Sequence, residues 1–139
     1  LARIRSAGVR LEEHPHLRVL PYLYNMPEAM AMADVAVFRA GATGLAELAA
    51  RGVPAILIPY PYAAENHQEK NARAMEAAGA AEVILNRDLS ADVLREALRR
   101  MLADDARRAH MAAAMKRLGK PEAAEEIAAL ALRICKGEG

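Results

Sequence analysis

The feature that most constrains the fold is the alternation of short aliphatic runs with longer stretches of helical composition. The aliphatic runs lie at 17–20, 34–38, 54–58 and 82–85. Such alternation is typical of βαβ units, in which helices connect the strands of a parallel sheet. The sequence therefore predicts an α/β fold with a parallel sheet whose strands include all four runs.

The helices between these runs have recognisable ends. Asn25 followed by Pro27 predicts the start of a short helix. Gly52 and Gly79 are expected to end two longer helices that begin near residues 43 and 67.

Beyond residue 85 the sequence predicts helices only. Ser90 can cap the first, the second contains residues 109–115, and the last contains residues 127–134 after Gly119 and Pro121. Apolar residues recur at helical spacing in this tail, so we expect it to pack onto the sheet or onto a neighbour. The basic run in it is interpreted as a solvated helix face: Arg99, Arg100, Arg107 and Arg108.

Length and charge narrow the class of protein. A chain of 139 residues fits one domain, and its net charge of +1 provides no basic field that would predict nucleic-acid binding. The single cysteine, Cys135, excludes an internal disulfide and a cysteine-rich zinc site. No apolar run approaches the ~20 residues of a membrane span, which favours a soluble, cytoplasmic protein.

The turn after the second aliphatic run is rich in small residues. Gly41, Ala42, Thr43 and Gly44 precede or open a helix, at the end of the sheet where ligands of open α/β folds bind. Amide groups at a helix start can bind a diphosphate, and small side chains leave them accessible. The turn lacks the Gly-Lys-Ser/Thr of a P-loop and the second glycine of GxGxxG, which disfavours an ATPase or a simple NAD enzyme.

Three further places carry candidate ligand contacts. Glu47, one turn into the same helix, can accept hydrogen bonds from two ribose hydroxyls, or it can simply complement the positive helix end. His67 and Gln68 head the next helix, where Gln68 suits a sugar hydroxyl and both also fit ordinary surface or structural roles. Tyr22 and Leu23 follow the first run and can hold a planar base, or serve as core residues.

Two linked motifs, FRAGATGLAE and PYPYAAENHQEKNA, make the stretch from residue 22 to 81 closely resemble the donor half of the MurG family. These are bacterial N-acetylglucosaminyltransferases that convert lipid I to lipid II. The resemblance implies a doubly wound, Rossmann-like half of a GT-B glycosyltransferase with helices on both faces and a helical C-terminal tail. It implies UDP-N-acetylglucosamine as the ligand, no cofactor and no metal.

The resemblance also implies a role for each candidate residue. Leu23 matches the position whose backbone meets uracil, with Tyr22 as the aromatic residue beside it. Glu47 matches the acid that binds the ribose. Ala42, Thr43 and Gly44 match the turn whose amides approach the diphosphate, and His67 and Gln68 match the pair that faces the sugar hydroxyls. Gly44 departs from the Thr or Ser of many family members, which leaves only an amide there. Arg39 fits the motif and is interpreted as structural support of the loop.

By the same resemblance, residues 1–120 are expected to form a UDP-sugar donor-binding domain that is incomplete at its N-terminal side, and 121–139 a C-terminal helix. The general base, the lipid I site and the membrane contact would belong to an N-terminal domain outside this chain, at the cytoplasmic face of the inner membrane. One alternative is a noncatalytic nucleotide-sugar binding subunit that requires a membrane-associated partner. Another is a doubly wound module for a different nucleotide, or a scaffold without a ligand.

Overall fold

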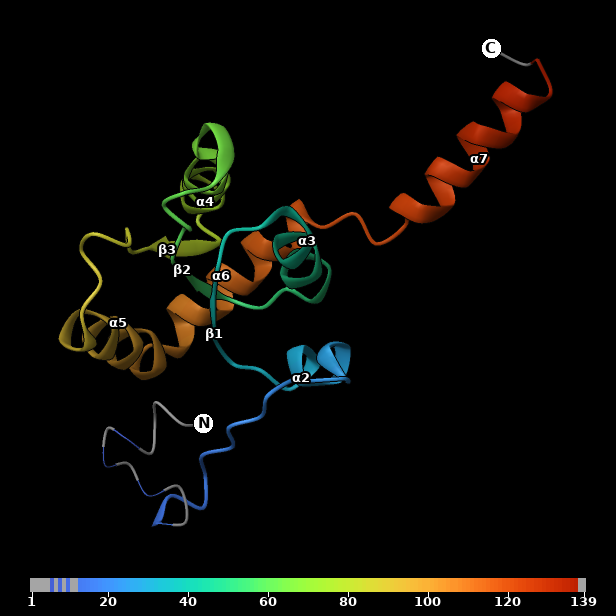
Figure 1. Ribbon diagram of the computed structural model, residues 1–139. Coiled ribbons are helices and arrows are strands. Elements are labelled where there is room, and N and C mark those ends of the chain that lie inside the picture. Colours follow the sequence, from blue (N-terminus) through green and yellow to red (C-terminus); the bar gives the residue numbers. More distant parts are fainter. Residues whose placement is uncertain (1–5, 7, 9, 11–12, 138–139) are drawn as a thin grey trace.

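A computed structural model describes residues 6, 8, 10 and 13–137 of the chain. Its centre is a three-stranded sheet covered by helices, and a last helix extends away from this body (Figure 1). The first residues of the expected domain 1–120 lie outside the described residues.

The sheet consists of β1 (Ala36–Phe38), β2 (Ala55–Leu57) and β3 (Ala81–Val83) in the order β1-β2-β3. Both pairings are parallel, with Val37 opposite Ile56 and Ile56 opposite Glu82. Three of the four predicted strand regions are therefore confirmed, although each strand is shorter than its aliphatic run. The predicted parallel α/β architecture with helices on both faces is also confirmed.

The prediction of a strand at 17–20 is wrong. This segment has no regular structure, and Leu17 and Leu20 are 49% and 58% exposed. Among the described residues, β1 pairs with β2 alone, so this segment has no neighbouring strand to complete a ladder. A strand requires such a partner for its backbone groups, whatever its side chains favour.

The helices before and between the strands begin and end close to the predicted positions. They are α2 (Met26–Ala31), α3 (Ala42–Arg51), the 3-10 turn η2 (Ala64–Asn66) and α4 (His67–Ala77). Asn25 precedes α2 and Pro27 occupies its first turn. Gly52 ends α3 with a φ of 71°, the left-handed conformation that favours glycine.

Three helices follow β3: α5 (Ala91–Ala103), α6 (Asp105–Leu118) and α7 (Ala123–Cys135). The Ser90 hydroxyl caps α5 by accepting a hydrogen bond from the Val93 amide at 3.1 Å. Asp104, which the sequence interpretation did not use, caps α6 through the Arg107 amide at 2.8 Å. A cap therefore replaces a loop between α5 and α6.

The buried strand β2 separates two apolar clusters. Ala55 and Leu57 face the cluster formed with α2, α3 and α4, whereas Ile56 faces the cluster formed with α5. Helix α6 contributes to both, with Met115 in the first and Met111 in the second. Since β2 is buried on both faces, its continuous aliphatic run is explained by burial rather than by alternation.

The basic run of α5 and α6 forms ion pairs instead of being only a solvated face. Arg100 and Arg107 both contact the Glu82 carboxylate, at 2.7 and 2.9 Å, and thereby connect both helices to β3. The hydrogen bond from Arg99 holds the pKa of Glu96 below its usual value.

The sequence predicted that the helical tail packs onto the sheet or onto a neighbour. Helix α7 does not pack onto the sheet. None of its residues is buried, and it projects from the body of the molecule (Figure 1). It leaves four large aliphatic side chains exposed: Ile127, Leu130, Leu132 and Ile134. Within the described part of the chain, no helix is long and apolar enough to cross a membrane.

Gly119 allows the end of α6 to approach α3 closely. A Cβ at this position would lie 2.8 Å from the backbone oxygen of Ala49. We expect Gly119→Ala to lower the free energy of unfolding by about 1–3 kcal/mol, because backbone atoms must move to accommodate the methyl group. Urea unfolding measures the change, and Lys120→Ala at the exposed next position is the control. Equal stability of the two variants would contradict this packing.

Candidate functional site

The carboxyl ends of the three parallel strands lie at one end of the sheet, and the turns that follow them meet there (Figure 1). The turn after β1 leads into α3, the turn after β2 leads through η2 into α4, and β3 continues toward α5. Ligands of open α/β sheets bind in this position. The candidate residues Gly41–Gly44, His67 and Gln68 all belong to these turns or to the helix starts that follow them.

The start of α3 is open for an anion. Gly41 precedes the helix with extended backbone angles, and its carbonyl accepts the first helical hydrogen bond from the Leu45 amide at 3.0 Å. No side chain caps this end, and the first turn contains no acidic residue. Ala42 and Thr43 are exposed. The first amides of the helix therefore keep their positive partial charge for an external partner.

Gly44 fits beneath the ring of Phe38. A Cβ on Gly44 would lie 2.5 Å from Cε1 of Phe38, so a side chain at position 44 of α3 would require the phenylalanine ring at the end of β1 to move. The lack of a hydroxyl at this position thus has a packing reason. Any contact from Gly44 to a ligand must come from its backbone.

Glu47 is exposed one turn further along α3, and its side chain borders a cavity between α2 and α3. The cavity has a volume of about 160 Å³ and is lined by Met26, Pro27, Met30, Glu47, Ala50 and Arg51. Glu47 therefore borders a mostly apolar opening that also includes Arg51, and its exposed carboxylate can accept hydrogen bonds from hydroxyl groups of a ligand. Sequence reasoning selected Glu47 but not the methionines of α2 that complete this cavity.

Gln68 lies beside the turn after β1. Its Oε1 accepts a hydrogen bond from the Tyr60 amide at 3.0 Å, and its Nε2 lies 3.9 Å from where a Cβ of Gly41 would be. The structure therefore brings Gln68 and Gly41 together across two turns of the chain. His67 is exposed, and its Nδ1 lies 2.8 Å from the carbonyl oxygen of Ala64. One ring nitrogen of His67 is thus used locally.

Two residues that sequence reasoning did not assign to the site connect its parts. The Asn71 side chain donates to the carbonyl oxygen of Ala40 at 3.3 Å and so fixes α4 against the turn that precedes α3. Arg39 contacts the segments that follow β2 and β3. The sequence interpretation named Arg39 only as loop support. Its partners are separated from it by 19 to 47 residues, so no local pattern could identify them.

Tyr22 and Leu23 lie in the irregular segment before α2. Tyr22 is 67% exposed and its ring makes an edge contact with Tyr24, while Leu23 is half-buried. The expectation that they follow a strand at the same end of the sheet is wrong, because that strand is absent. They instead precede α2, the helix that lines the cavity beside Glu47.

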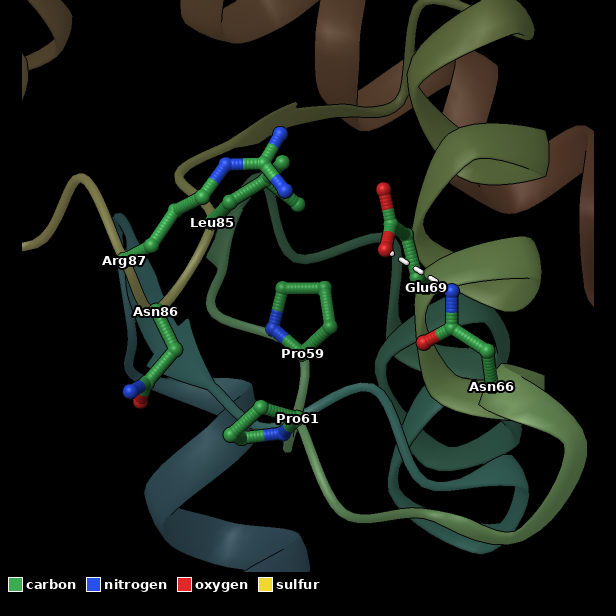
Figure 2. A pocket seen from close by; sticks show the side chains of 7 residues that line it. All are labelled: Pro59, Pro61, Asn66, Glu69, Leu85, Asn86 and Arg87. Atoms are coloured by element: carbon green, nitrogen blue, oxygen red, sulfur yellow. Dashed lines mark hydrogen bonds between the residues drawn. The ribbon is translucent and has the colours of Figure 1, made fainter.

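A second, smaller cavity of about 90 Å³ lies beyond the turn after β2. Figure 2 shows Pro59 and Pro61 between the chain after β3, with Leu85, Asn86 and Arg87, and the start of α4, with Glu69. The Asn66 amide donates to the Glu69 carboxylate at 2.9 Å. Among the residues that the structure describes, no group of three or more His, Cys, Asp or Glu side chains is arranged to hold a metal ion.

Comparison with known proteins identifies similar sequences over nearly the whole chain. Residues 4–127 match the model of the glycosyltransferase family 28 C-terminal domain. The chain is 44% identical over 137 residues to a protein of Halothermothrix orenii and 45% identical over 127 residues to one of Desulforamulus reducens. Both relatives are named UDP-N-acetylglucosamine--N-acetylmuramyl-(pentapeptide) pyrophosphoryl-undecaprenol N-acetylglucosamine transferase. Neither name describes a noncatalytic subunit, so that alternative is not favoured.

Solved structures give the same result. The crystal structure of Acinetobacter baumannii MurG matches with a TM-score of 0.73 and 31% identity, covering 81% of this chain and 34% of that one. The glycotransferase of kitacinnamycin matches with a TM-score of 0.67 and 27% identity, covering 86% and 31%. The two curated relatives are covered over 37% and 34% of their own length, against 99% and 91% of this chain. The chain thus spans about a third of the relatives it matches.

The contact between Gly44 and Phe38 predicts a change of sign in a double-mutant experiment. Gly44→Ala should lower the free energy of unfolding by about 1–3 kcal/mol, because the ring must move aside. In a Phe38→Ala background the same substitution should be neutral or should stabilise by up to about 1 kcal/mol, since alanine is the better helix former. Thermal or urea unfolding of the four proteins measures both values. The same cost in both backgrounds would contradict the packing described here.

Proposed function

The chain belongs to glycosyltransferase family 28, and from this premise we propose that it binds UDP-N-acetylglucosamine as the donor of a glycosyl transfer reaction. The observation that carries the proposal is the open start of α3, with Glu47 exposed one turn further along the same helix. A diphosphate needs several converging donors, because a single contact with a helix dipole contributes only about 0.3–1 kcal/mol. The exposed start of α3 supports such a site with consecutive backbone amides.

Each part of the donor is assigned to residues of the turns after β1 and β2, of α3 or of the segment before α2. The diphosphate binds the amides of Ala42, Thr43 and Gly44 that follow Gly41. Glu47 accepts hydrogen bonds from the ribose hydroxyls, and its exposed position one turn beyond the open start of α3 supports this role. The segment with Tyr22 and Leu23 receives the uracil. His67 and Gln68 contact the sugar hydroxyls, which is supported by the proximity of Gln68 to Gly41.

The reaction is proposed for a protein as long as the relatives, of which this chain spans about a third. A hydroxyl of the acceptor attacks the anomeric carbon and gives its proton to a general base in the domain outside this chain, while the bond from that carbon to the diphosphate breaks and UDP leaves with the bonding electrons. The acceptor is lipid I, the muramyl-pentapeptide pyrophosphoryl-undecaprenol that the relatives' names specify. This chain stabilises the charge that develops on the diphosphate and orients the sugar.

The division of labour follows from the same proposal. Residues 1–120 supply donor binding, residues 121–139 form the C-terminal helix, and acceptor and membrane contacts belong to another domain. Because the acceptor named for the relatives carries an undecaprenol chain, the reaction is proposed to take place at a membrane. The proposed side is the cytoplasmic face of the bacterial inner membrane.

Isothermal titration calorimetry tests donor binding directly. We expect heat with UDP-N-acetylglucosamine and with UDP, weaker binding of UDP-glucose, and no binding of NAD, because the α3 turn lacks the dinucleotide fingerprint. Binding of NAD without binding of any uridine ligand would replace this proposal with the module for a different nucleotide. Absence of binding for all four would leave the scaffold interpretation.

Glu47→Gln tests the assignment of the ribose. The loss of a charged hydrogen-bond acceptor should weaken UDP binding roughly 10- to 100-fold, because hydrogen bonds to a charged group contribute about 1.5–3 kcal/mol. Glu126→Gln in the first turn of α7 is a matched control that removes the same charge from an exposed helix. Equal affinities of the two variants for UDP would contradict a role for Glu47 in binding.

A further inference from the structure

We propose that Arg39 is a positioning residue that fixes Gln68 for recognition of the sugar, an inference that rests on the proposed function. Arg39 follows β1 immediately, and its Nη1 lies within hydrogen-bond distance of atoms from the two other strand exits. These atoms are the carbonyl oxygens of Ile58 and Pro59, at 3.1 and 3.2 Å, and Oδ1 of Asn86, at 3.1 Å. One side chain thus connects the carboxyl ends of β1, β2 and β3.

The turn after β2 combines backbone hydrogen bonds of its own, such as that from the Ala63 amide to the Tyr60 carbonyl at 3.3 Å, with the contacts from Arg39. Pro59 and Pro61 have no amide hydrogen, so neither can donate a backbone hydrogen bond within the turn. Figure 2 shows both prolines between the chain after β3 and the start of α4. The Arg39 guanidinium also lies over the Tyr60 ring, with Cζ 5.9 Å from its centroid. Arg39 therefore holds both the carbonyl of Pro59 and the side chain of Tyr60.

The contact continues from Tyr60 to Gln68. The Tyr60 amide donates to Oε1 of Gln68 at 3.0 Å, and this bond defines which end of the Gln68 amide is oxygen and which is nitrogen. Nε2 then lies beside Gly41, next to the open start of α3. Gln68 consequently presents a donor to the ligand side only while Tyr60 keeps its place. Arg39 acts on the ligand through Tyr60 and Gln68 and does not need to touch it.

Arginine is suited to this position in a way that lysine is not. Its Nη1 shares two hydrogens among three acceptors while the planar group lies over the Tyr60 ring, whereas an ammonium group is a compact charge without such a face. The ribose and diphosphate contacts are proposed for Glu47 and the α3 amides, whereas the groups that Arg39 contacts belong to the segments after β2 and β3. Loss of Arg39 should therefore impair recognition of the sugar and leave recognition of UDP nearly intact.

The experiment compares UDP-N-acetylglucosamine with UDP in calorimetry on the full chain, for the unmodified protein, Arg39→Gln, Arg39→Lys and Gln68→Ala. Arg39→Gln should weaken UDP-N-acetylglucosamine binding roughly 3- to 10-fold while UDP binding changes less than about twofold, the size expected for one hydrogen bond. Arg39→Lys should recover only part of the loss. Gln68→Ala should weaken UDP-N-acetylglucosamine binding to the same extent. The double variant with Arg39→Gln and Gln68→Ala should lose little more affinity, because both residues act through one contact.

Arg95→Gln is the matched control, since Arg95 is exposed on α5 and pairs with Asp92. It should change neither affinity. A fall in UDP affinity as large as that for the UDP-sugar would overturn the positioning role, because it would mean direct contact with the diphosphate or a general loss of the fold. Additive losses in the double variant would overturn it as well.

Nuclear magnetic resonance separates failure of this inference from failure of the proposed function. The Tyr60 backbone amide and the Gln68 side-chain amide should shift in Arg39→Gln without any ligand, and should keep their positions in Arg95→Gln. Unchanged signals in Arg39→Gln would overturn the inference even if the chain binds UDP-N-acetylglucosamine. Shifted signals in a chain that binds no uridine ligand would overturn the proposed function, and the sugar-facing role of Gln68 with it.

Discussion

Parallel pairing of β2 with a strand on each side is the constraint from which the rest of the structure follows. The ladder continues past the strand ends, where the Ile58 amide donates to Phe38 and the Ile84 amide donates to Leu57, at 2.9 and 3.0 Å. This alignment brings three chain exits to the same end of the sheet. Because β2 is apolar on both faces, helices must cover both, and the helix connections begin where the strands end. The start of α3 and the turns after β1 and β2 consequently lie at the same end of the sheet.

Much of this fold could be predicted from local patterns in the sequence. Gly52, Gly79 and Ser90 marked helix ends correctly, because a left-handed residue or a capping hydroxyl acts on its own neighbours. The segment 17–20 shows where such reasoning fails. Its composition favours a strand, but a strand depends on a partner whose presence no local pattern reveals. The ion pairs of Glu82 with two later helices were unpredictable for the same reason.

In the candidate site too, local features could be predicted from the sequence, whereas contacts between distant segments could not. The glycine-rich start of α3 was visible in the sequence, because small residues before a helix have a direct physical meaning. The cavity at Glu47 required the packing of α2 against α3, and the orientation of Gln68 required the fold of the turn at Pro59. The left-handed conformation of Glu65 before α4 could not be anticipated either, since glutamate is not typical of it, whereas the neighbouring Asn66 adopts it more readily. The sequence indicated which residues to select for the site, but it did not indicate the directions in which their side chains point.

Helix α7 illustrates a different kind of independence. An isolated helix of its length is only marginally stable in water, and it gains no support from the buried clusters of the domain. Packing of α7 therefore does not contribute to the folding free energy of the sheet and its covering helices. Substitutions on α7 should leave the stability of that body unchanged. The exposed aliphatic side chains of α7 favour association with other apolar surfaces, and the packing of the folded body does not cover them.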